Sequence, residues 1–200
     1  MFDVPVIQLR QRSSQLEYEI SDGDERPIGE AVQVAGPAPR KGVMSMFGSG
    51  LGDARVVVRV DDAGGRPVCY VDHKPKCPVA IVSAGGAVLG RYDTDLFGMS
   101  RQGIRGSGFL SPVVVPMCDR LLDAQDRTVC RLVWKQKVRD QRRIPESARY
   151  RGVDDEPVAE LDYKAATHKD RYRLELAGPL PEPLRTLVAV SPLAFDLRES

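Results

Sequence analysis

The first two thirds of the chain alternate apolar and polar residues with a period of two. In the segment 15–20, for example, Leu16, Tyr18 and Ile20 alternate with polar residues. A period of two places apolar side chains on one face of a β-strand and polar side chains on the other. The sequence therefore predicts strands with one dry face and one wet face.

This pattern recurs as a strand–turn–strand unit. Turns of four or five residues rich in Asp or Gly separate the apolar runs, because Gly tolerates positive φ and Asp can bond its own backbone. Four hairpins are predicted, at Leu16–Val34, Val56–Val71, Val79–Tyr92 and Leu121–Trp134. Repeated hairpins indicate an antiparallel meander, and a large sheet with so many turns is expected to close or curl, which removes its exposed edges.

The carboxy-terminal part changes from strand to helix. Tyr172, Leu174 and Leu176 alternate as a last strand, and the prolines of 178–183 stand where the first turn of a helix accepts them. Beyond them, residues 184–197 are apolar on nearly every side, so this helix must be buried. It is too short to span a membrane.

Two segments lack the hairpin pattern. Residues 36–53 are rich in Gly, Pro and Met and predict a long loop or a short helix with flexible flanks. Residues 135–169 predict a charged insertion in a single domain that covers 1–200. Within 135–151, seven basic residues stand against Asp140 and Glu146, and the acidic run 154–156 then reverses the sign.

Composition limits the classes of protein. The 200 residues include 29 Lys and Arg, 28 Asp and Glu, 18 Gly and 15 Pro, which suits one turn-rich domain with a core. A net charge of +1 excludes a nucleic-acid binder that relies on bulk charge. Four dispersed cysteines and no amino-terminal signal pattern predict a cytoplasmic, thiol-reduced protein, and no apolar run is long enough for a transmembrane helix.

A strand–proline–helix block at 170–185 is the most distinctive part of the sequence. With the opening strand 6–12, the hairpin 16–34 and the segments 88–91 and 96–98, it resembles the superfamily with the tubby C-terminal-like fold. That superfamily includes the LURP-one-related and phospholipid scramblase-related proteins, and bacterial, actinobacterial-type members are the most similar. The resemblance covers most of the chain.

The resemblance implies a mainly β fold, a closed antiparallel β-barrel of about 12 strands around a buried C-terminal hydrophobic helix, with no established enzyme chemistry. Members of the wider group are associated with phosphoinositide binding, phospholipid movement or unassigned roles. The chain lacks the cysteine cluster of animal scramblases, and near the last strand it offers only Asp170 where those proteins carry an acidic calcium-binding stretch. Calcium-triggered scrambling is therefore not implied.

No catalytic, metal or cofactor site is predicted. Cys69, His73 and Cys77 have a zinc-compatible spacing, but no fourth ligand is evident nearby. Neither His73 nor His168 has a Ser or Cys nucleophile motif around it, so we expect no enzyme. The glycine-rich run 48–52 leads into a strand and lacks the Lys-Ser/Thr ending of a phosphate loop.

The candidate lipid-binding residues form two groups. One is a basic pair beside an apolar loop, and the other is a basic stretch: Arg40, Lys41, Met44 and Phe47, then Lys135, Lys137, Arg139, Arg142 and Arg143. Each Lys or Arg near an anionic leaflet is worth about 1 kcal/mol, so several acting together predict salt-sensitive binding. The alternative is a solvated charged loop and a Met-Phe loop that caps the barrel mouth.

We therefore expect a non-enzymatic module that binds an anionic phospholipid surface, cytoplasmic or peripheral at the inner membrane face. The alternative is a soluble scaffold whose charged insertion docks a protein partner. Nucleic acid as partner ranks lower, because only Trp134 and Tyr150 are close enough to the basic stretch for base stacking.

Overall fold

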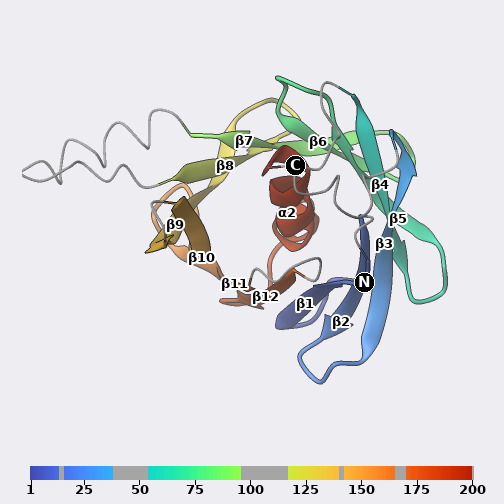
Figure 1. The fold of residues 1–200 in the computed structure, drawn as a ribbon, viewed down its shortest axis with the longest axis horizontal. Helices are drawn as coiled ribbons and strands as arrows, with labels where there is room; N and C mark the ends of the chain where they lie inside the picture. The colour runs from blue at the N-terminus through green and yellow to red at the C-terminus, as the bar shows by residue number, and fades with distance from the viewer. Residues whose placement is uncertain (14–15, 38–53, 96–116, 140–141, 165–169, 200) are drawn as a thin grey trace, which may run out of the picture.

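Twelve antiparallel strands in the described part of the chain form one closed barrel, with a single helix inside it (Figure 1). The structure is a computed structural model that describes residues 1–13, 16–37, 54–95, 117–139, 142–164 and 170–199. Each strand pairs with its neighbours in the chain, and β1 closes the barrel against β12. The predicted fold class is confirmed.

The strands are β1 (Val6–Gln11), β2 (Glu17–Asp22), β3 (Pro27–Ala35), β4 (Val56–Asp62), β5 (Pro67–His73), β6 (Val79–Ser83), β7 (Val88–Thr94), β8 (Cys118–Asp123), β9 (Thr128–Arg139), β10 (Arg142–Arg151), β11 (Pro157–Lys164) and β12 (Arg171–Leu176). The helix is α2 (Leu184–Glu199). All four predicted hairpins are confirmed, as β2–β3, β4–β5, β6–β7 and β8–β9.

Three of the hairpin turns share one design. An Asp side chain at the end of the first strand accepts hydrogen bonds from the backbone N–H groups two and four residues later, at 2.9–3.0 Å. The residue three positions later has positive φ. The aspartates are Asp22, Asp62 and Asp123, and the positive-φ residues are Glu25, Gly65 and Asp126. Each turn therefore satisfies its own backbone from residues close in sequence.

The stretch 135–169, expected as a charged insertion, instead supplies the end of β9, the strand β10 and the strand β11, while 165–169 lie outside the described residues. In β10, Ala148 and Tyr150 are buried whereas Arg149 is exposed. The charges therefore belong to the outer face of ordinary two-faced strands. Because so many charged residues occupy that face, the alternation of apolar and polar positions is hard to detect in the sequence.

The helix α2 runs through the middle of the barrel, and its central residues 187–195 are fully covered (Figure 1). This confirms the predicted buried helix. Pro192 lies inside it and has no N–H for the carbonyl of Val188. The hydroxyl of Ser191 donates to that carbonyl at 2.7 Å, and Tyr150 hydrogen bonds to the same Ser191 hydroxyl at 2.8 Å. The Ser191 hydroxyl therefore replaces the hydrogen bond that Pro192 cannot make, and Tyr150 of the barrel wall holds that hydroxyl in place.

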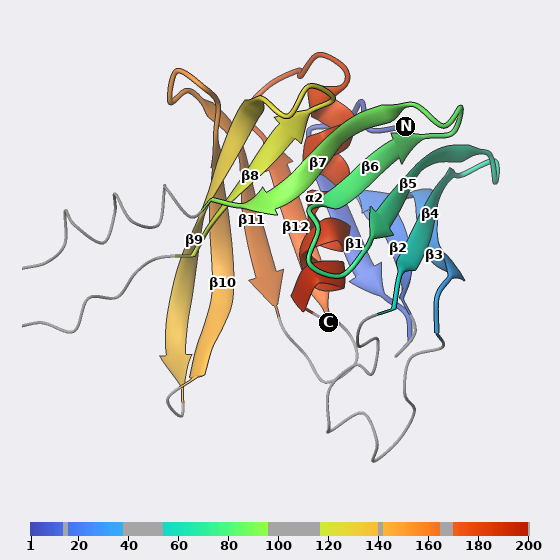
Figure 2. The ribbon, with the colours of Figure 1, turned by 90° about the horizontal axis from the view of Figure 1, so that it is seen from above.

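The antiparallel order sends successive connections to alternate ends of the barrel (Figure 2). The turns after β2, β4, β6, β8 and β10, and the link from β12 to α2, lie at one end, which we call the turn end. The C-terminus of α2 lies at the other, which we call the helix-C end. At the helix-C end β1, β3, β5, β7, β9 and β11 finish.

Candidate functional site

The hairpin β9–β10 extends beyond its neighbours at the helix-C end (Figure 2). Pairing between β8 and β9 reaches only Val133 in β9, and pairing between β10 and β11 starts only at Ser147. Among the described residues, 135–139 and 142–146 therefore pair only with each other, as a two-stranded ribbon that we call the β9–β10 arm. It contains the basic stretch that the sequence singled out.

The arm presents positive charge to solvent. Lys135 and Lys137 are both exposed; Lys135 pairs with Glu146 at 3.0 Å, and Lys137 has no ion pair with a described residue. The hydrogen bond and charge of Lys135 lower the pKa of Glu146.

Near the tip of the arm, the backbone register pairs Arg139 with Arg142 and Val138 with Arg143. Lys135, Lys137 and Arg139 thus stand two apart along β9, and Arg142 is directly across from Arg139.

The first predicted group, Arg40, Lys41, Met44 and Phe47, lies outside the described residues, as does the glycine-rich run 48–52. The described residues on either side of this segment are Pro37, after β3, and Ala54, before β4. Both strand ends are at the helix-C end of the barrel, the end to which the arm extends. The topology therefore starts and finishes this segment at the end that carries the second group.

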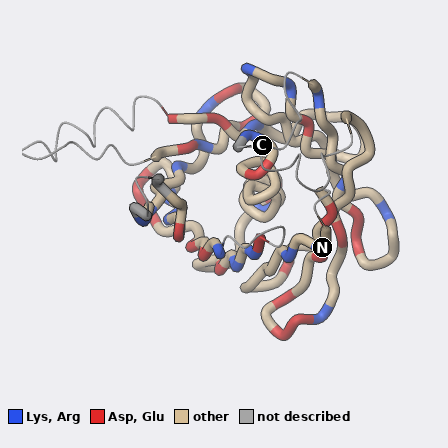
Figure 3. The backbone as a smooth tube through the Cα atoms, in the orientation of Figure 1, with Lys and Arg blue, Asp and Glu red and all other residues tan. Residues whose placement is uncertain are grey.

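The described basic side chains without a carboxylate partner are concentrated at the helix-C end. Apart from Arg151 at the turn end, they are Arg10, Lys74, Lys76, Lys137, Lys164 and Arg171. All six are exposed. Lys and Arg are interleaved with Asp and Glu around the whole barrel wall (Figure 3), so the difference between the ends comes from pairing rather than from composition.

At the turn end, cations and carboxylates neutralise each other locally. Arg66 pairs with Asp62 at 3.1 Å and Arg127 with Asp123 at 2.7 Å, each four residues apart. The amide hydrogen bond from Arg66 lowers the pKa of Asp62, with burial opposing it, and the amide of Arg127 does the same for Asp123. The turn end therefore offers little free positive charge.

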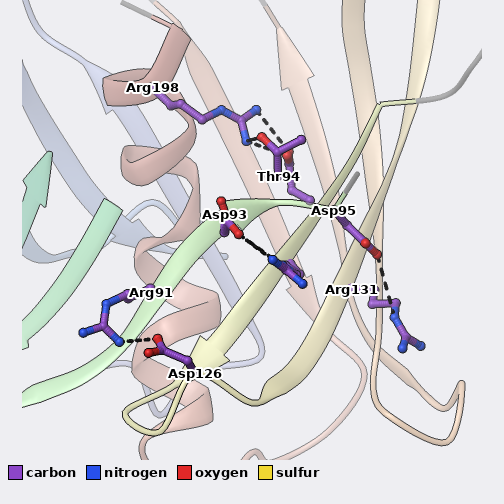
Figure 4. A network of polar contacts seen from close by, with 9 residues as sticks. Arg91, Asp93, Thr94, Asp95, Asp126, Arg131 and Arg198 are labelled. Atoms are coloured by element: carbon purple, nitrogen blue, oxygen red, sulfur yellow. Dashed lines mark hydrogen bonds and ion pairs between the residues drawn. The ribbon is translucent and has the colours of Figure 1, made fainter. Parts of the chain in front are cut away.

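Inside the helix-C end, a buried carboxylate ties α2 to the barrel wall. Asp119 is fully buried and accepts hydrogen bonds from Tyr92 at 2.6 Å, from Trp134 at 2.7 Å and from Arg198 at 2.5 Å. Arg198 also donates to Thr94 at 3.0 Å (Figure 4). Burial, followed by the charge of Asp119, raises the pKa of Tyr92. This network fixes the last turn of the helix, and the sequence analysis did not identify it.

A second carboxylate, this one on α2 itself, ties the helix to the opposite wall. Asp196 accepts hydrogen bonds from the hydroxyls of Tyr18 on β2 and Tyr172 on β12. Burial is the main cause, and the charge of Asp196 the second, that raises the pKa of both tyrosines well above the ordinary value for tyrosine. Asp119 and Asp196 thus hold the helix in place, and these interior groups have a structural role.

The Cys69, His73 and Cys77 spacing does not produce a cluster. Cys69 is buried, and burial raises the pKa of its thiol to about 12. Cys77 is exposed in the connection after β5. Burial lowers the pKa of His73. Among the described residues no group of three or more His, Cys, Asp or Glu is arranged to hold a metal ion.

No helix in the described ranges is long and apolar enough to cross a membrane.

Comparisons with known proteins assign no family to this chain. No family model matches the chain, and no curated protein matches it. Among solved structures, it is similar to the X-ray structure of the Arabidopsis thaliana protein AT5G01750, with 12% sequence identity, a TM-score of 0.46 and coverage of 98% of this chain and 93% of that one. A likeness at this level of identity and TM-score transfers neither a function nor the role of any residue.

Proposed function

We propose that this chain is a bacterial relative of the LURP-one-related and scramblase-related proteins, and a non-enzymatic module that binds anionic phospholipid surfaces through its helix-C end. The observation that carries the proposal is the concentration of exposed, unpaired cations at that end of the barrel. The β9–β10 arm carries five basic positions in two short strands, of which Lys137 is already among these unpaired cations. Binding would be peripheral, at the inner face of the membrane.

Pairing decides which end faces the lipid. An unpaired lysine or arginine near an anionic leaflet contributes about 1 kcal/mol, whereas a cation already bonded to a carboxylate contributes much less. The turn end carries Asp22, Asp62 and Asp123 and acidic residues 154–156, which an anionic surface repels. Although the net charge is only +1, the unpaired positive charge lies at one end of the molecule. The helix-C end would therefore face the membrane.

Cosedimentation with vesicles tests this proposal. Phosphatidylcholine vesicles with and without phosphatidylglycerol are compared at low and physiological salt, with duplex DNA as competitor. Binding is expected only to the anionic vesicles, to weaken as salt screens the charges, and to survive the DNA.

Two matched variants locate the surface. The first replaces Lys135, Lys137, Arg139, Arg142 and Arg143 by Gln, and should lose most of the binding. The second removes the same charge from the turn-end half, by changing Arg26, Arg66, Arg127, Arg149 and Arg151 to Gln, and should keep it. Equal losses in the two variants contradict the assignment to the helix-C end.

The second candidate function is a scaffold that binds a protein partner, and the edges of the arm favour it. In the described part of the chain, 135–139 have no pairing partner in β8 and 142–146 have none in β11. Such edges can accept an extended peptide as an added strand. If the unmodified chain binds no vesicle under any of these conditions, the lipid proposal fails and the scaffold function takes its place.

A further inference from the structure

Three basic side chains stand side by side on the outer wall, away from the arm. The strands β1, β12 and β11 are neighbours, and their register pairs Arg10 with Arg171 and Arg171 with Lys164. Side chains at directly paired positions lie on the same face, about 5 Å apart at Cβ. All three are exposed, and none forms an ion pair or a side-chain hydrogen bond with another described residue.

This row differs from other rows of like charge on the wall because its three side chains have no ion pair with a described residue. Like charges at directly opposed positions destabilise a sheet, whereas opposite charges stabilise it. Complementary pairs occur across neighbouring strands, such as Arg120 with Asp93 at 2.7 Å. Like charges also face each other at Glu19, Glu30 and Asp61, but there Arg12 pairs with Glu19 and Glu30, and Arg59 pairs with Asp61. The row places two like-charged contacts next to each other, so an anion that bridged the three side chains would relieve their repulsion.

The row lies along a shallow hollow of about 270 Å³ on the same wall. Gln8 and Arg173 continue the lining toward the turn end, and Arg173 pairs with Glu175 at 2.7 Å. Three carboxylates also line the hollow: Glu19 is directly opposite Arg10 in the register and pairs with Arg12 at 3.4 Å, while Asp162 and Glu25 lie closer to the turn end than the row. At its helix-C end the hollow therefore has three unpaired basic side chains beside one carboxylate, Glu19, which is already paired with Arg12.

We propose that Arg10, Lys164 and Arg171 form a binding site for a phosphate monoester. A guanidinium presents parallel N–H donors that match two phosphate oxygens, and an ammonium adds a point charge, so two arginines and a lysine suit one phosphate group. A monoester carries a charge approaching −2 near pH 7, whereas a diester carries −1, so the monoester is favoured. The small hollow leaves room for a phosphate and a short attached group. This site goes beyond the proposed function, since a soluble phosphate would also occupy it.

Titration with inorganic phosphate, followed by amide NMR shifts of the full chain, tests the site. Saturable shifts are expected at the amides of residues 10, 164 and 171. The triple variant Arg10→Gln, Lys164→Gln and Arg171→Gln should weaken phosphate binding about tenfold or more. The control variant Lys74→Gln, Lys76→Gln and Arg151→Gln removes the same charge from unpaired cations elsewhere and should leave the affinity unchanged.

Vesicles that contain phosphatidic acid, which exposes a phosphate monoester, are then compared with phosphatidylglycerol vesicles of equal surface charge. A preference for phosphatidic acid that the triple variant loses supports the site with a lipid as the source of the phosphate. Phosphate binding without this preference supports the site with a soluble source. The site is overturned if phosphate causes no saturable shifts, or if the control variant loses as much phosphate affinity as the triple variant. Because the arm variant should still titrate with phosphate, failure of the membrane proposal is distinguishable from failure of this one.

Discussion

The two ends of the barrel satisfy their polar groups in different ways. At the turn end, Asp22, Asp62 and Asp123 bond to backbone groups two to four residues away. At the helix-C end the hydrogen bonds join distant parts of the chain, as between Tyr18 and Asp196 or between Asp119 and Arg198. The Asp turns are thus built from neighbouring residues and are internally neutralised, whereas the helix-C end is held from inside and leaves cations free on its surface.

The largest expected effect is at the helix-C end. Asp119→Ala should destabilise the protein by about 3–5 kcal/mol, because it removes the buried carboxylate that accepts hydrogen bonds from Tyr92, from Trp134 and from Arg198, whose side chain is only 19% exposed. Urea unfolding monitored by circular dichroism measures the loss. Asp119→Asn keeps an acceptor for Tyr92 and Trp134 and should cost less. A loss below about 1 kcal/mol for the alanine variant would show that the helix end is not anchored there.

A local turn should matter less. Asp123→Ala removes the acceptor for two backbone N–H groups and for Arg127, all within four residues and all able to bond to water instead. We expect Tm to fall by about 2–4 °C in a thermal melt. Gln125→Ala in the same turn removes only a side-chain contact with Arg127 and serves as the control. A fall as large as that of Asp119→Ala would erase the distinction between the two ends.

Acid should weaken the turn end selectively. The pKa values of Asp62 and Asp123 are lower in the folded protein than the value of about 3.9 for a free aspartate, so both carboxylates stabilise the fold above that pH. This stability is lost as the pH falls through the folded pKa values. The double variant Asp62→Asn and Asp123→Asn should therefore be less stable than the parent at neutral pH, with the difference shrinking as the pH falls below 4. Stability against pH by urea unfolding gives the comparison, and a constant difference over that range would contradict it.

The smallest effect is expected on the outer wall, and it has the opposite sign. Arg171→Gln removes both like-charged contacts of the row and should raise Tm by about 1–3 °C at low salt, with a smaller rise at high salt. Arg149→Gln, which removes a cation that faces Glu160, should not raise it. A lower Tm for Arg171→Gln would mean that this arginine stabilises the wall, and that the row is not a strained arrangement kept for a ligand.

Local patterns predicted the hairpins well but missed part of the wall. The Asp-initiated turns were identifiable because their donors and acceptors are all within four residues. The strands β10 and β11 were missed because exposed charges such as Arg149 and Glu160 mask the inward positions of Ala148, Tyr150 and Leu161. Attention to the small and aromatic residues two apart would have identified them.

The candidate site was only partly accessible from the sequence. The basic stretch of the arm was identified as a cluster because its members are close together along the chain. That Lys74, Lys76 and Lys164 lie at the same end could be inferred only once the strand order was known. Whether each cation has a carboxylate partner depends on side-chain positions, which no pattern along the sequence contains.

The sequence by itself determined the elements of this protein, namely two-faced strands, self-contained Asp turns and a helix apolar enough to require burial. Each of these follows from interactions between residues a few positions apart. Only the tertiary structure decided that Arg10 in the first strand lies beside Arg171 in the last, and that Asp119 meets Arg198. Barrel closure and its register set those neighbours, because cross-strand positions depend on how the whole sheet closes and not on the residues next to them in sequence.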